Sequence, residues 1–228
     1  MSVKYSLVIP CFNESSSLPI LISEIRSLSN NAEIEFILVD NGSNDSTPEI
    51  LNAVLDMNIL KLKLEKNIGY GGGIKAGLAI ARGEYVGWIH ADLQYSLIDS
   101  LKFLNHADSN TKYIKGRRKG RTLFQNFISA NMSLFETLLF GHILYDINAQ
   151  PTIFHKNMLL DMADAPNDFS IDLYSYVIAK KRKFKVTRHK VYFKNRAFGK
   201  STWNSGLRSI IAMSVRTIKY SWSLRQII

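Results

Sequence analysis

Hydrophobic and polar residues follow a repeating order along the first ninety positions. Short apolar runs, each followed by a polar loop, lie at residues 5–9, 34–39, 59–64 and 85–89. Runs of this length that are rich in β-branched residues predict buried strands. Apolar residues recur at helical spacing from Leu18 to Leu28, which predicts a helix after the first strand. Strands that alternate with helices favour right-handed crossovers and a mainly parallel sheet flanked by helices.

Later segments carry further signals. Pro48 follows a polar loop and predicts the first residue of a second helix. Residues 67–73 predict a glycine-rich turn, and residues 74–81 predict a helix of small residues. Beyond these the pattern is looser, and we expect a basic loop over 115–121, a helix over 122–140, a return segment over 146–154 and a helix–strand pair over 171–193.

Length and charge limit the class of protein. A chain of 228 residues can bury a sizeable core in one large domain. The formal net charge is +10, with basic residues concentrated at 115–121 and 180–200. This asymmetry predicts a polyanionic partner, which leaves nucleic acid, an acidic membrane surface and a phosphorylated small molecule open. The single cysteine, Cys11, lies in an apolar run and predicts a buried, unreactive thiol in a reducing compartment.

The C-terminal segment combines apolar and basic residues. It carries Arg216 and Lys219 among apolar side chains, so no run reaches the roughly 18–20 uncharged residues that span a bilayer. With no signal-peptide pattern at the start, we expect a cytoplasmic location. An apolar face with basic flanks and Trp222 fits a helix on an anionic membrane, and a packed terminal helix or an oligomer contact are the alternatives. We therefore divide the chain into residues 1–206 and an amphipathic segment, 207–228.

Polar side chains follow three predicted strands at their carboxyl ends, where open α/β sheets bind ligands. They are Asn13 with Glu14, Asp40 with Asn41, and His90 with Asp92. Mg²⁺ or Mn²⁺ ions that bridge phosphates need one or two protein carboxylates, and Asp92 with Gln94 suits that need. Asp92 is equally suited to cap a following helix, and the loop from Asp40 is a good turn sequence in any protein.

The glycine-rich segment from Gly69 to Gly73, followed by Lys75, suggests a second contact with phosphates. Free backbone amides at a helix N-terminus bind phosphate groups. The segment matches neither the phosphate-loop spacing nor the dinucleotide pattern. A tight turn that lets a helix approach the sheet closely is the alternative for Gly71 and Gly72.

Five ordered elements carry a resemblance to a known family. They are Val8-Ile-Pro-Cys-Phe-Asn-Glu14, Val39-Asp-Asn-Gly-Ser43, Asn67-Ile-Gly69, Ala81-Arg-Gly-Glu-Tyr85 and His90-Ala-Asp-Leu-Gln94. Together they resemble family 2 glycosyltransferases, most closely the polyprenyl-phosphate sugar transferases typified by dolichol-phosphate mannose synthase. The match resumes at Asp146 and at residues 196–201. The resemblance implies a GT-A fold, which is the nucleotide-diphospho-sugar transferase fold.

The resemblance also implies roles for individual residues. Donor-binding positions are Pro10, Asn13 and Glu14 around the base and ribose, Asp40 on the base or ribose, and Asn41, Gly69, Lys75 and Ala91. Asp92 with Gln94 would hold Mg²⁺ or Mn²⁺, and His90 is a candidate third ligand. Phosphate-pairing positions are Arg117 with Arg118 or Arg121, then Arg196 and Lys200. The predicted catalytic residues are Asp92, Asp146, Arg117 and Arg196.

Three positions depart from the family pattern. His90 stands where the first acid of the Asp-x-Asp signature is usual, and Asn41 replaces the second acid of a common Asp-Asp pair. Residues 148–154 replace the Ser-Gly-Phe segment expected after Asp146. The departure at His90 bears on metal binding, and the departure at residues 148–154 bears on the identity of the acceptor.

The predicted reaction is inverting transfer of a sugar from a UDP- or GDP-sugar in cell-surface polysaccharide synthesis. The acceptor is a polyprenyl phosphate or a glycan hydroxyl, and a hydroxyl would need a general base such as Asp146 or Asp172. We favour the phosphate because the late half of the chain is basic. We expect no nucleic-acid partner, contact with the inner face of the membrane, and homo-oligomerisation as a further option. A nucleotidyltransferase and a metal-site-degenerate nucleotide-sugar-binding protein are the alternative functions.

Overall fold

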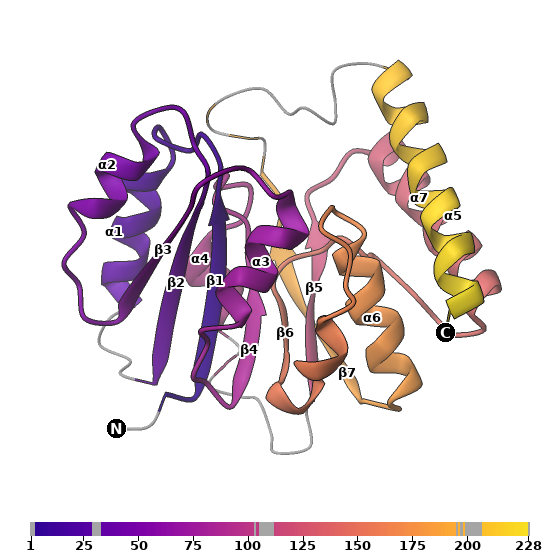
Figure 1. Cartoon of the computed structure of the whole chain (residues 1–228). Helices are drawn as coiled ribbons and strands as arrows, with labels where there is room; N and C mark the ends of the chain where they lie inside the picture. Colours follow the sequence, from indigo (N-terminus) through magenta and orange to yellow (C-terminus); the bar gives the residue numbers. More distant parts are fainter. Residues whose placement is uncertain are drawn as a thin grey trace.

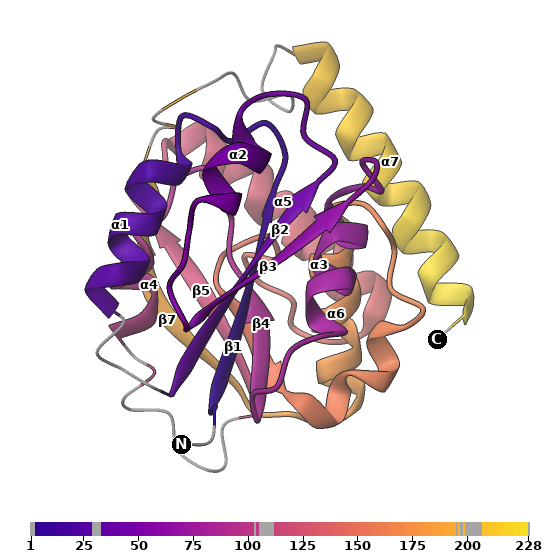
Figure 2. The same ribbon diagram turned by 60° about the vertical axis from the view of Figure 1, so that its left-hand side comes forward.

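A computed structural model describes residues 3–28, 33–102, 104, 112–194, 196, 198 and 207–227. The described strands form one seven-stranded sheet in the order β3-β2-β1-β4-β6-β5-β7. Helices cover both faces of this sheet (Figure 1). The turned view separates the layers, with α1 and α2 on one face and α3 and α6 on the other (Figure 2).

The first half of the chain alternates strands and helices as predicted. Its elements are β1 (Tyr5–Cys11), α1 (Leu18–Leu28), β2 (Ile34–Asn41), α2 (Thr47–Asn52), β3 (Ile59–Leu64), α3 (Tyr70–Leu78) and β4 (Tyr85–Trp88). Strands β1 to β4 pair in parallel. The prediction of a mainly parallel sheet is confirmed, and the parallel strands place their carboxyl ends at one edge.

The second half of the chain completes the sheet beyond β4. Its elements are α4 (Leu97–Leu101), β5 (Tyr113–Lys119), α5 (Leu123–Phe140), β6 (Thr152–His155), the short 3₁₀ helices η2 (Lys156–Met158) and η3 (Leu160–Met162), α6 (Ile171–Lys181), β7 (Val186–Tyr192) and α7 (Leu207–Ile227). Strand β6 is antiparallel to β4 and β5, and β7 is parallel to β5. The sheet is therefore mixed.

The predicted basic loop over 115–121 is wrong, because most of that segment is strand β5. Lys115 is fully buried, and its Nζ lies 3.3 Å from Asp172 Oδ1. Arg118 pairs in the same way with Asp146. A run of basic residues indicates a solvated loop only when acids elsewhere in the chain do not neutralise it.

The predicted turn over 67–73 is also corrected, because α3 begins at Tyr70 and includes three of its glycines. A Cβ on Gly71 would lie 2.2 Å from the carbonyl oxygen of Pro166. A Cβ on Gly77 would lie 2.4 Å from Val8. Glycines therefore let α3 lie against both the loop at 166–168 and the sheet.

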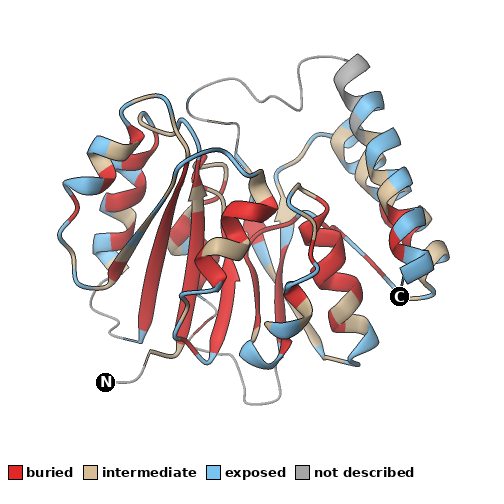
Figure 3. Ribbon diagram, viewed as in Figure 1, coloured by how far each residue is buried: buried red, intermediate tan, exposed pale blue. Residues whose placement is uncertain are grey.

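Apolar side chains form one buried cluster on each face of the sheet. Figure 3 shows that the central strands consist mostly of buried residues. Cys11 belongs to the cluster under α1, is completely buried, and has a thiol pKa that burial raises above its ordinary value. The prediction of a buried thiol is confirmed, and the raised pKa disfavours the reactive thiolate.

Helix α7 packs against α5 along its inner face. Leu224 is buried there, and the Ser221 hydroxyl donates a hydrogen bond of 2.6 Å to Glu136 Oε1. In the ranges that the structure describes, no helix combines the length and apolar character needed to cross a membrane.

Candidate active site

A cavity of about 560 Å³ opens at the carboxyl ends of β1, β2 and β4. Predicted site residues that line it are Pro10, Asn13, Glu14, Asn41, His90, Ala91, Asp92, Gln94 and Arg196. These residues are far apart in sequence, and the parallel strands bring them together because their ends share one edge of the sheet.

The loop after β1 is fastened to the loop after β2. Asn13 has a positive φ of 56°, and its Oδ1 accepts a hydrogen bond of 2.8 Å from the backbone amide of Asn44. The Glu14 amide donates to Thr47 Oγ1 at 2.9 Å. The two loops therefore form one rim of the cavity.

Asp45 strengthens this rim, although the sequence marks it only as part of a polar loop. Its carboxylate accepts hydrogen bonds from the amides of Ser15 (3.1 Å) and Thr47 (3.0 Å). Burial opposes ionisation, but the hydrogen bonds from Thr47 and Ser15 outweigh it and lower the pKa of Asp45 to about 2. The ionised carboxylate thus holds the two loops together.

Asp40 and Asn41 lie at the end of β2, and their side chains have different environments. Asp40 is 2% exposed and does not line the cavity; its Oδ1 accepts from the Ser43 amide, whereas its Oδ2 has no hydrogen-bond partner among the described residues. The Asn41 side chain lines the cavity and binds the start of α3, donating to the Gly69 carbonyl at 2.9 Å and accepting from the Ile68 amide at 3.1 Å.

Asp92 lies just beyond β4 and is 9% exposed. Its Oδ1 accepts from the Gln94 amide at 3.1 Å, and its Oδ2 lies 3.8 Å from His90 Nδ1. Burial alone would raise the pKa of Asp92, but His90, the Gln94 amide and Arg196 outweigh it, and the pKa lies below its ordinary value. Ser96, and not Asp92, caps α4, so the capping interpretation of Asp92 is wrong.

These donors fit a hard divalent cation that arrives with phosphate. Mg²⁺ and Mn²⁺ accept one or two carboxylates and complete their coordination with phosphate oxygens and water. In the described part of the chain, no group of three or more His, Cys, Asp or Glu side chains is placed to hold a metal. Asp92 and the neighbouring Gln94 therefore offer fewer ligands than such an ion needs, and phosphate oxygens and water would have to supply the rest.

Arg196 places a guanidinium at the cavity. Its Nη2 lies 2.7 Å from Glu14 Oε1, and its side chain is 26% exposed. The remaining carboxylate oxygen of Glu14 accepts from the Ser17 hydroxyl at 2.7 Å. A cation is therefore held over the same cavity as Asp92, where an anionic ligand can reach it.

The structure does not bring Gly69 and Lys75 to the cavity. The Gly69 amide donates to Asn67 Oδ1 at 2.8 Å, and the Gly72 amide donates to the Asn167 carbonyl at 3.1 Å. The Lys75 ammonium donates to the Ala165 carbonyl at 2.7 Å. These groups hold α3 in place and are not available to cradle phosphates. Lys200 lies outside the described residues.

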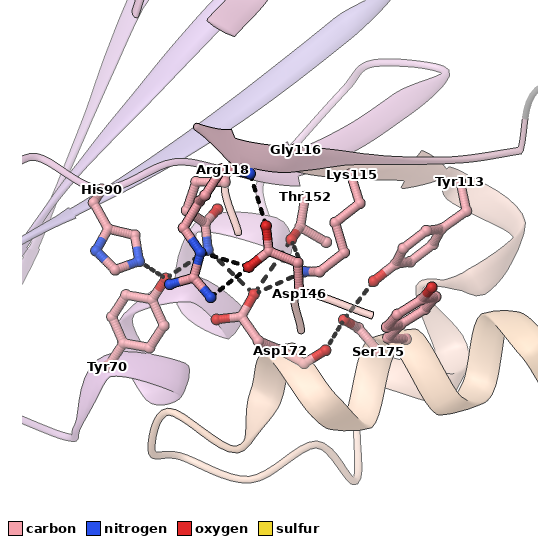
Figure 4. A network of polar contacts seen from close by, with 12 residues as sticks. Tyr70, His90, Tyr113, Lys115, Gly116, Arg118, Asp146, Thr152, Asp172 and Ser175 are labelled. Atoms are coloured by element: carbon pink, nitrogen blue, oxygen red, sulfur yellow. Dashed lines mark hydrogen bonds and ion pairs between the residues drawn. The ribbon is translucent and has the colours of Figure 1, made fainter. Parts of the chain in front are cut away.

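Arg117 and Asp146 also lie away from the cavity lining. Arg117 is exposed on β5, with its guanidinium 5.7 Å from the centre of the Tyr145 ring. Asp146 is 5% exposed and accepts from the Arg118 amide at 2.7 Å and from Arg118 Nε at 2.6 Å. Burial would raise the pKa of Asp146, and Arg118 reverses that effect so that the pKa lies below its ordinary value. Figure 4 shows this pair beside the Lys115–Asp172 pair.

Tyr70 and Phe169, two of the aromatic residues in the cavity lining, were not singled out from the sequence. Tyr70 and Phe169 stack with their ring centres 4.3 Å apart, and the Tyr70 hydroxyl lies 2.9 Å from His90 Nε2. Tyr70 immediately follows Gly69 in the glycine-rich segment, so its position gave a signal. Phe169 has none, because only tertiary packing brings it beside α3.

Several curated proteins are similar to this chain in sequence. The chain is 28% identical over 163 residues to an undecaprenyl-phosphate 4-deoxy-4-formamido-L-arabinose transferase of Photorhabdus laumondii, covering 68% of this chain and 50% of that protein. It is 31% identical over 102 residues to a dolichyl-phosphate beta-glucosyltransferase of Dictyostelium discoideum, covering 40% and 31% respectively. The chain thus spans about half the length, or less, of these curated relatives.

Solved structures share the fold. The glucosyl-3-phosphoglycerate synthase of Mycobacterium tuberculosis in complex with uridine diphosphate gives a TM-score of 0.74 at 18% identity, covering 98% of this chain and 80% of that one. The mannosyl-3-phosphoglycerate synthase of Rubrobacter xylanophilus gives 0.71 at 18% identity, covering 98% and 75%. The predicted GT-A fold is confirmed.

The sequence resemblance is confirmed at the level of the family. The family model described as Glycosyl transferase family 2 matches residues 6–159, which is more than half of the chain. The chain belongs to glycosyl transferase family 2.

Proposed function

We propose that the protein is an inverting glycosyltransferase that moves a sugar from a UDP- or GDP-sugar to a polyprenyl phosphate. The observation that carries this proposal is the convergence of Asp92, Arg196 and the loop after β1 on one cavity at the edge of the sheet. The family and the polyprenyl-phosphate transferases among its relatives support it.

The donor would lie along this edge with its base toward β2. Asp40 lies behind the cavity lining, and its buried Oδ2 has no hydrogen-bond partner among the described residues. A shift of the loop after β2 would let an N–H group of the base or a ribose hydroxyl reach and satisfy it. Pro10, Asn13 and Glu14 form the adjoining wall. Arg196 would exchange Glu14 for a phosphate of the donor, because a guanidinium pairs with either anion.

Negative charge grows on the leaving diphosphate as its bond to the sugar breaks. A bound Mg²⁺ or Mn²⁺ ion at Asp92 would neutralise the negative charge that grows on the diphosphate. The acceptor oxygen attacks the anomeric carbon from the opposite side, the bond to the diphosphate breaks, and the nucleoside diphosphate departs. Arg196 contributes a second positive charge that is already in position.

The lack of a free acidic side chain among the described residues of the cavity favours a phosphate acceptor over a hydroxyl, because a hydroxyl would need a general base. Among the described residues that line the cavity, the acids are Glu14 and Asp92, and Glu14 pairs with Arg196. Asp146 and Asp172, the candidate general bases, are held by Arg118 and Lys115. An acceptor phosphate is already anionic and needs no base.

Helices α5 and α7 provide a surface for peripheral contact with a membrane. Exposed large apolar side chains recur at helical spacing on each helix: Leu123, Phe124, Phe127, Leu134 and Leu138 on α5, and Ile211, Val215, Ile218 and Trp222 on α7. Exposed apolar stripes next to basic residues suit the anionic inner face of a membrane. This contact would bring the cavity to a lipid-linked acceptor.

The test is a transfer assay with the donor chosen by thermal shift, because a ligand that binds only the folded state raises its stability. Nucleoside diphosphate release is measured with polyprenyl phosphate and with the matching polyprenol, each with and without Mn²⁺. We expect release that needs both the phosphate and the cation. Pyrophosphate release would indicate a nucleotidyltransferase, and donor binding without turnover would indicate a binding protein.

A further inference from the structure

A second cavity, of about 120 Å³, lies between α5, α6 and α7. Helices α5 and α7 run beside one another in Figure 1. Apolar side chains such as Met132 on α5 and Leu173 on α6 form part of its wall, and Ser214 and Thr217 of α7 add hydroxyl groups. Phe169 lines both this cavity and the larger one, so the two cavities adjoin.

Glu136 is a completely buried acid on the wall of this second cavity. Its Oε1 accepts a hydrogen bond of 2.6 Å from the Ser221 hydroxyl, whereas its buried Oε2 has no hydrogen-bond partner among the described residues. Burial raises the pKa of Glu136 to about 7, and no basic side chain in the described part of the chain offsets that effect. The carboxyl group therefore lacks the donor that buried polar groups normally have.

A primary ammonium group has the chemistry that Glu136 Oε2 lacks. It supplies a positive charge and three N–H donors, and hydrogen bonds between charged groups are the strong ones. A hydroxyl would satisfy the oxygen but would leave the charge of the buried carboxylate uncompensated. The cavity has room for a group of a few heavy atoms, because one buried water needs only about 10–15 Å³.

Arg216 adds a positive charge to the lining of the same cavity. Its side chain is 56% exposed, and its Nε lies 3.7 Å from Asp168 Oδ2. A guanidinium has five N–H donors, so it can bind a phosphate group while it stays beside Asp168. Exposed apolar side chains, among them Ile211 and Val215, lie on the same helix. The cavity thus combines a buried carboxyl group, an accessible cation and a neighbouring apolar surface.

We propose that this cavity binds the phosphoethanolamine headgroup of a membrane lipid, with the ammonium group on Glu136 and the phosphate beside Arg216. The acyl chains would lie along the exposed apolar side chains of α5 and α7. None of the described side chains at 211, 212 and 214–217 is buried, whereas Ser221 and Leu224 are. An outward movement of the more exposed part of α7 would admit the headgroup to Glu136. The proposal rests on the proposed membrane contact and not on sugar transfer.

The first test compares vesicles of phosphatidylglycerol mixed in equal parts with phosphatidylethanolamine or with phosphatidylcholine. The choline headgroup has the same phosphate and the same charge, but its trimethylated nitrogen has no N–H donor. Co-sedimentation of the full chain should show at least about tenfold tighter binding to the ethanolamine mixture, the effect of one hydrogen bond to a charged group. Equal binding to both mixtures would overturn the proposal and leave the membrane contact in place.

Glu136→Gln keeps the shape of the side chain and removes its charge. We expect this variant to bind the two vesicle mixtures equally. Glu49→Gln is the matched control, because it removes one charge from an exposed acid on α2. A preference for ethanolamine that survives in Glu136→Gln, or that disappears in both variants, would contradict the assignment to this cavity.

A second measurement needs no membrane. Thermal unfolding of the full chain is followed with glycerophosphoethanolamine, with glycerophosphocholine and with free ethanolamine, because a ligand that binds only the folded state raises the Tm. We expect glycerophosphoethanolamine to raise the Tm of the wild type more than the other two compounds do, and to leave the Tm of Glu136→Gln unchanged.

The outcomes of this measurement separate the lipid from other ligands. An equal rise with free ethanolamine would indicate a site for small amines and contradict a lipid ligand, and no rise with any compound would overturn the site. A rise with glycerophosphoethanolamine in a protein that does not bind vesicles would contradict the proposed membrane contact and leave the headgroup site standing.

Discussion

Arg196 Nη2 lies 2.7 Å from Glu14 Oε1 at the cavity, which joins the segment after β7 to the loop after β1. A donor diphosphate would compete with Glu14 for this guanidinium. We therefore expect the donor diphosphate to take the place of the Glu14 carboxylate beside Arg196.

Arg196→Ala is expected to lower kcat/KM by roughly ten- to a hundredfold, because a hydrogen bond to a charged group contributes about 1.5–3 kcal/mol. Arg182→Ala is the control, since its guanidinium pairs with Asp161 on the surface at 2.8 Å and does not line the cavity. Steady-state kinetics over a donor concentration series measures both. Equal losses in the two variants would rule out a specific role for Arg196.

Asp92→Asn is expected to lower divalent-dependent turnover by at least about a hundredfold, because charge stabilisation by a cation contributes several kcal/mol. The asparagine oxygen can still accept from the Gln94 amide, so the fold should survive. Asp56→Asn, which breaks a surface pair with Arg26, is the control. Turnover is compared across an Mn²⁺ series, with circular dichroism as the check on folding, and full activity of Asp92→Asn would remove Asp92 from the mechanism.

Asp45→Ala should destabilise the protein in a pH-dependent way. The pKa of Asp45 is about 2 in the folded state, below the roughly 3.9 of an unfolded chain, so its contribution exists above about pH 4 and disappears as pH falls toward 2. Since the side chain is partly solvated, we expect a loss of only about 1 kcal/mol at neutral pH. Urea unfolding at several pH values tests this, with Asp99→Ala on α4 as the control. A difference from the wild type that does not shrink in acid would contradict it.

Glu136→Gln should stabilise the protein at alkaline pH. Burial raises the pKa of Glu136 to about 7, with the hydrogen bond from Ser221 opposing the shift. The folded state therefore holds a proton that the unfolded state, with a pKa of about 4.3, has lost, and stability falls as pH rises from about 4 to 7. We expect the variant to gain about 1–3 kcal/mol near pH 8 and little near pH 4. Unfolding curves at both pH values decide, and equal gains at both would contradict the assignment.

Membrane contact predicts that Leu123→Glu with Phe127→Glu weakens binding to vesicles containing phosphatidylglycerol by at least about tenfold, because burying one such side chain contributes roughly 1.5–3 kcal/mol. Both residues are more than half exposed on α5. Leu55→Glu with Met57→Glu is the matched control, since those side chains are also more than half exposed and lie between α2 and β3. Co-sedimentation measures both pairs. Undiminished binding of the α5 variant would place the contact elsewhere.

The alternation of strands and helices was predictable in the first half because its strands are apolar runs closed by polar loops. The second half was harder for a physical reason. Strand β5 contains Lys115, Arg117 and Arg118, and two of these charges are neutralised by Asp172 and Asp146, which lie far along the chain. Local sequence shows the cations and not their partners, so a buried strand looks like a basic loop.

The residues of the candidate site also differ in how well the sequence predicts them. Asp92, Glu14 and Asn41 were predictable because polar residues at the ends of parallel strands share one edge of the sheet. Phe169 reaches the cavity only through the packing of α6 and the loop before it against α3. Gly69 and Lys75 looked like phosphate ligands because the sequence does not reveal that protein carbonyls and side chains already occupy their hydrogen-bonding groups.

A crystal structure with Mn²⁺ and either uridine or guanosine diphosphate tests the central claim most directly. The account predicts anomalous density for the cation beside Asp92 and a diphosphate between that cation and Arg196, with the base toward Asp40. A nucleotide bound away from this cavity, or a cation that does not contact Asp92, would contradict it.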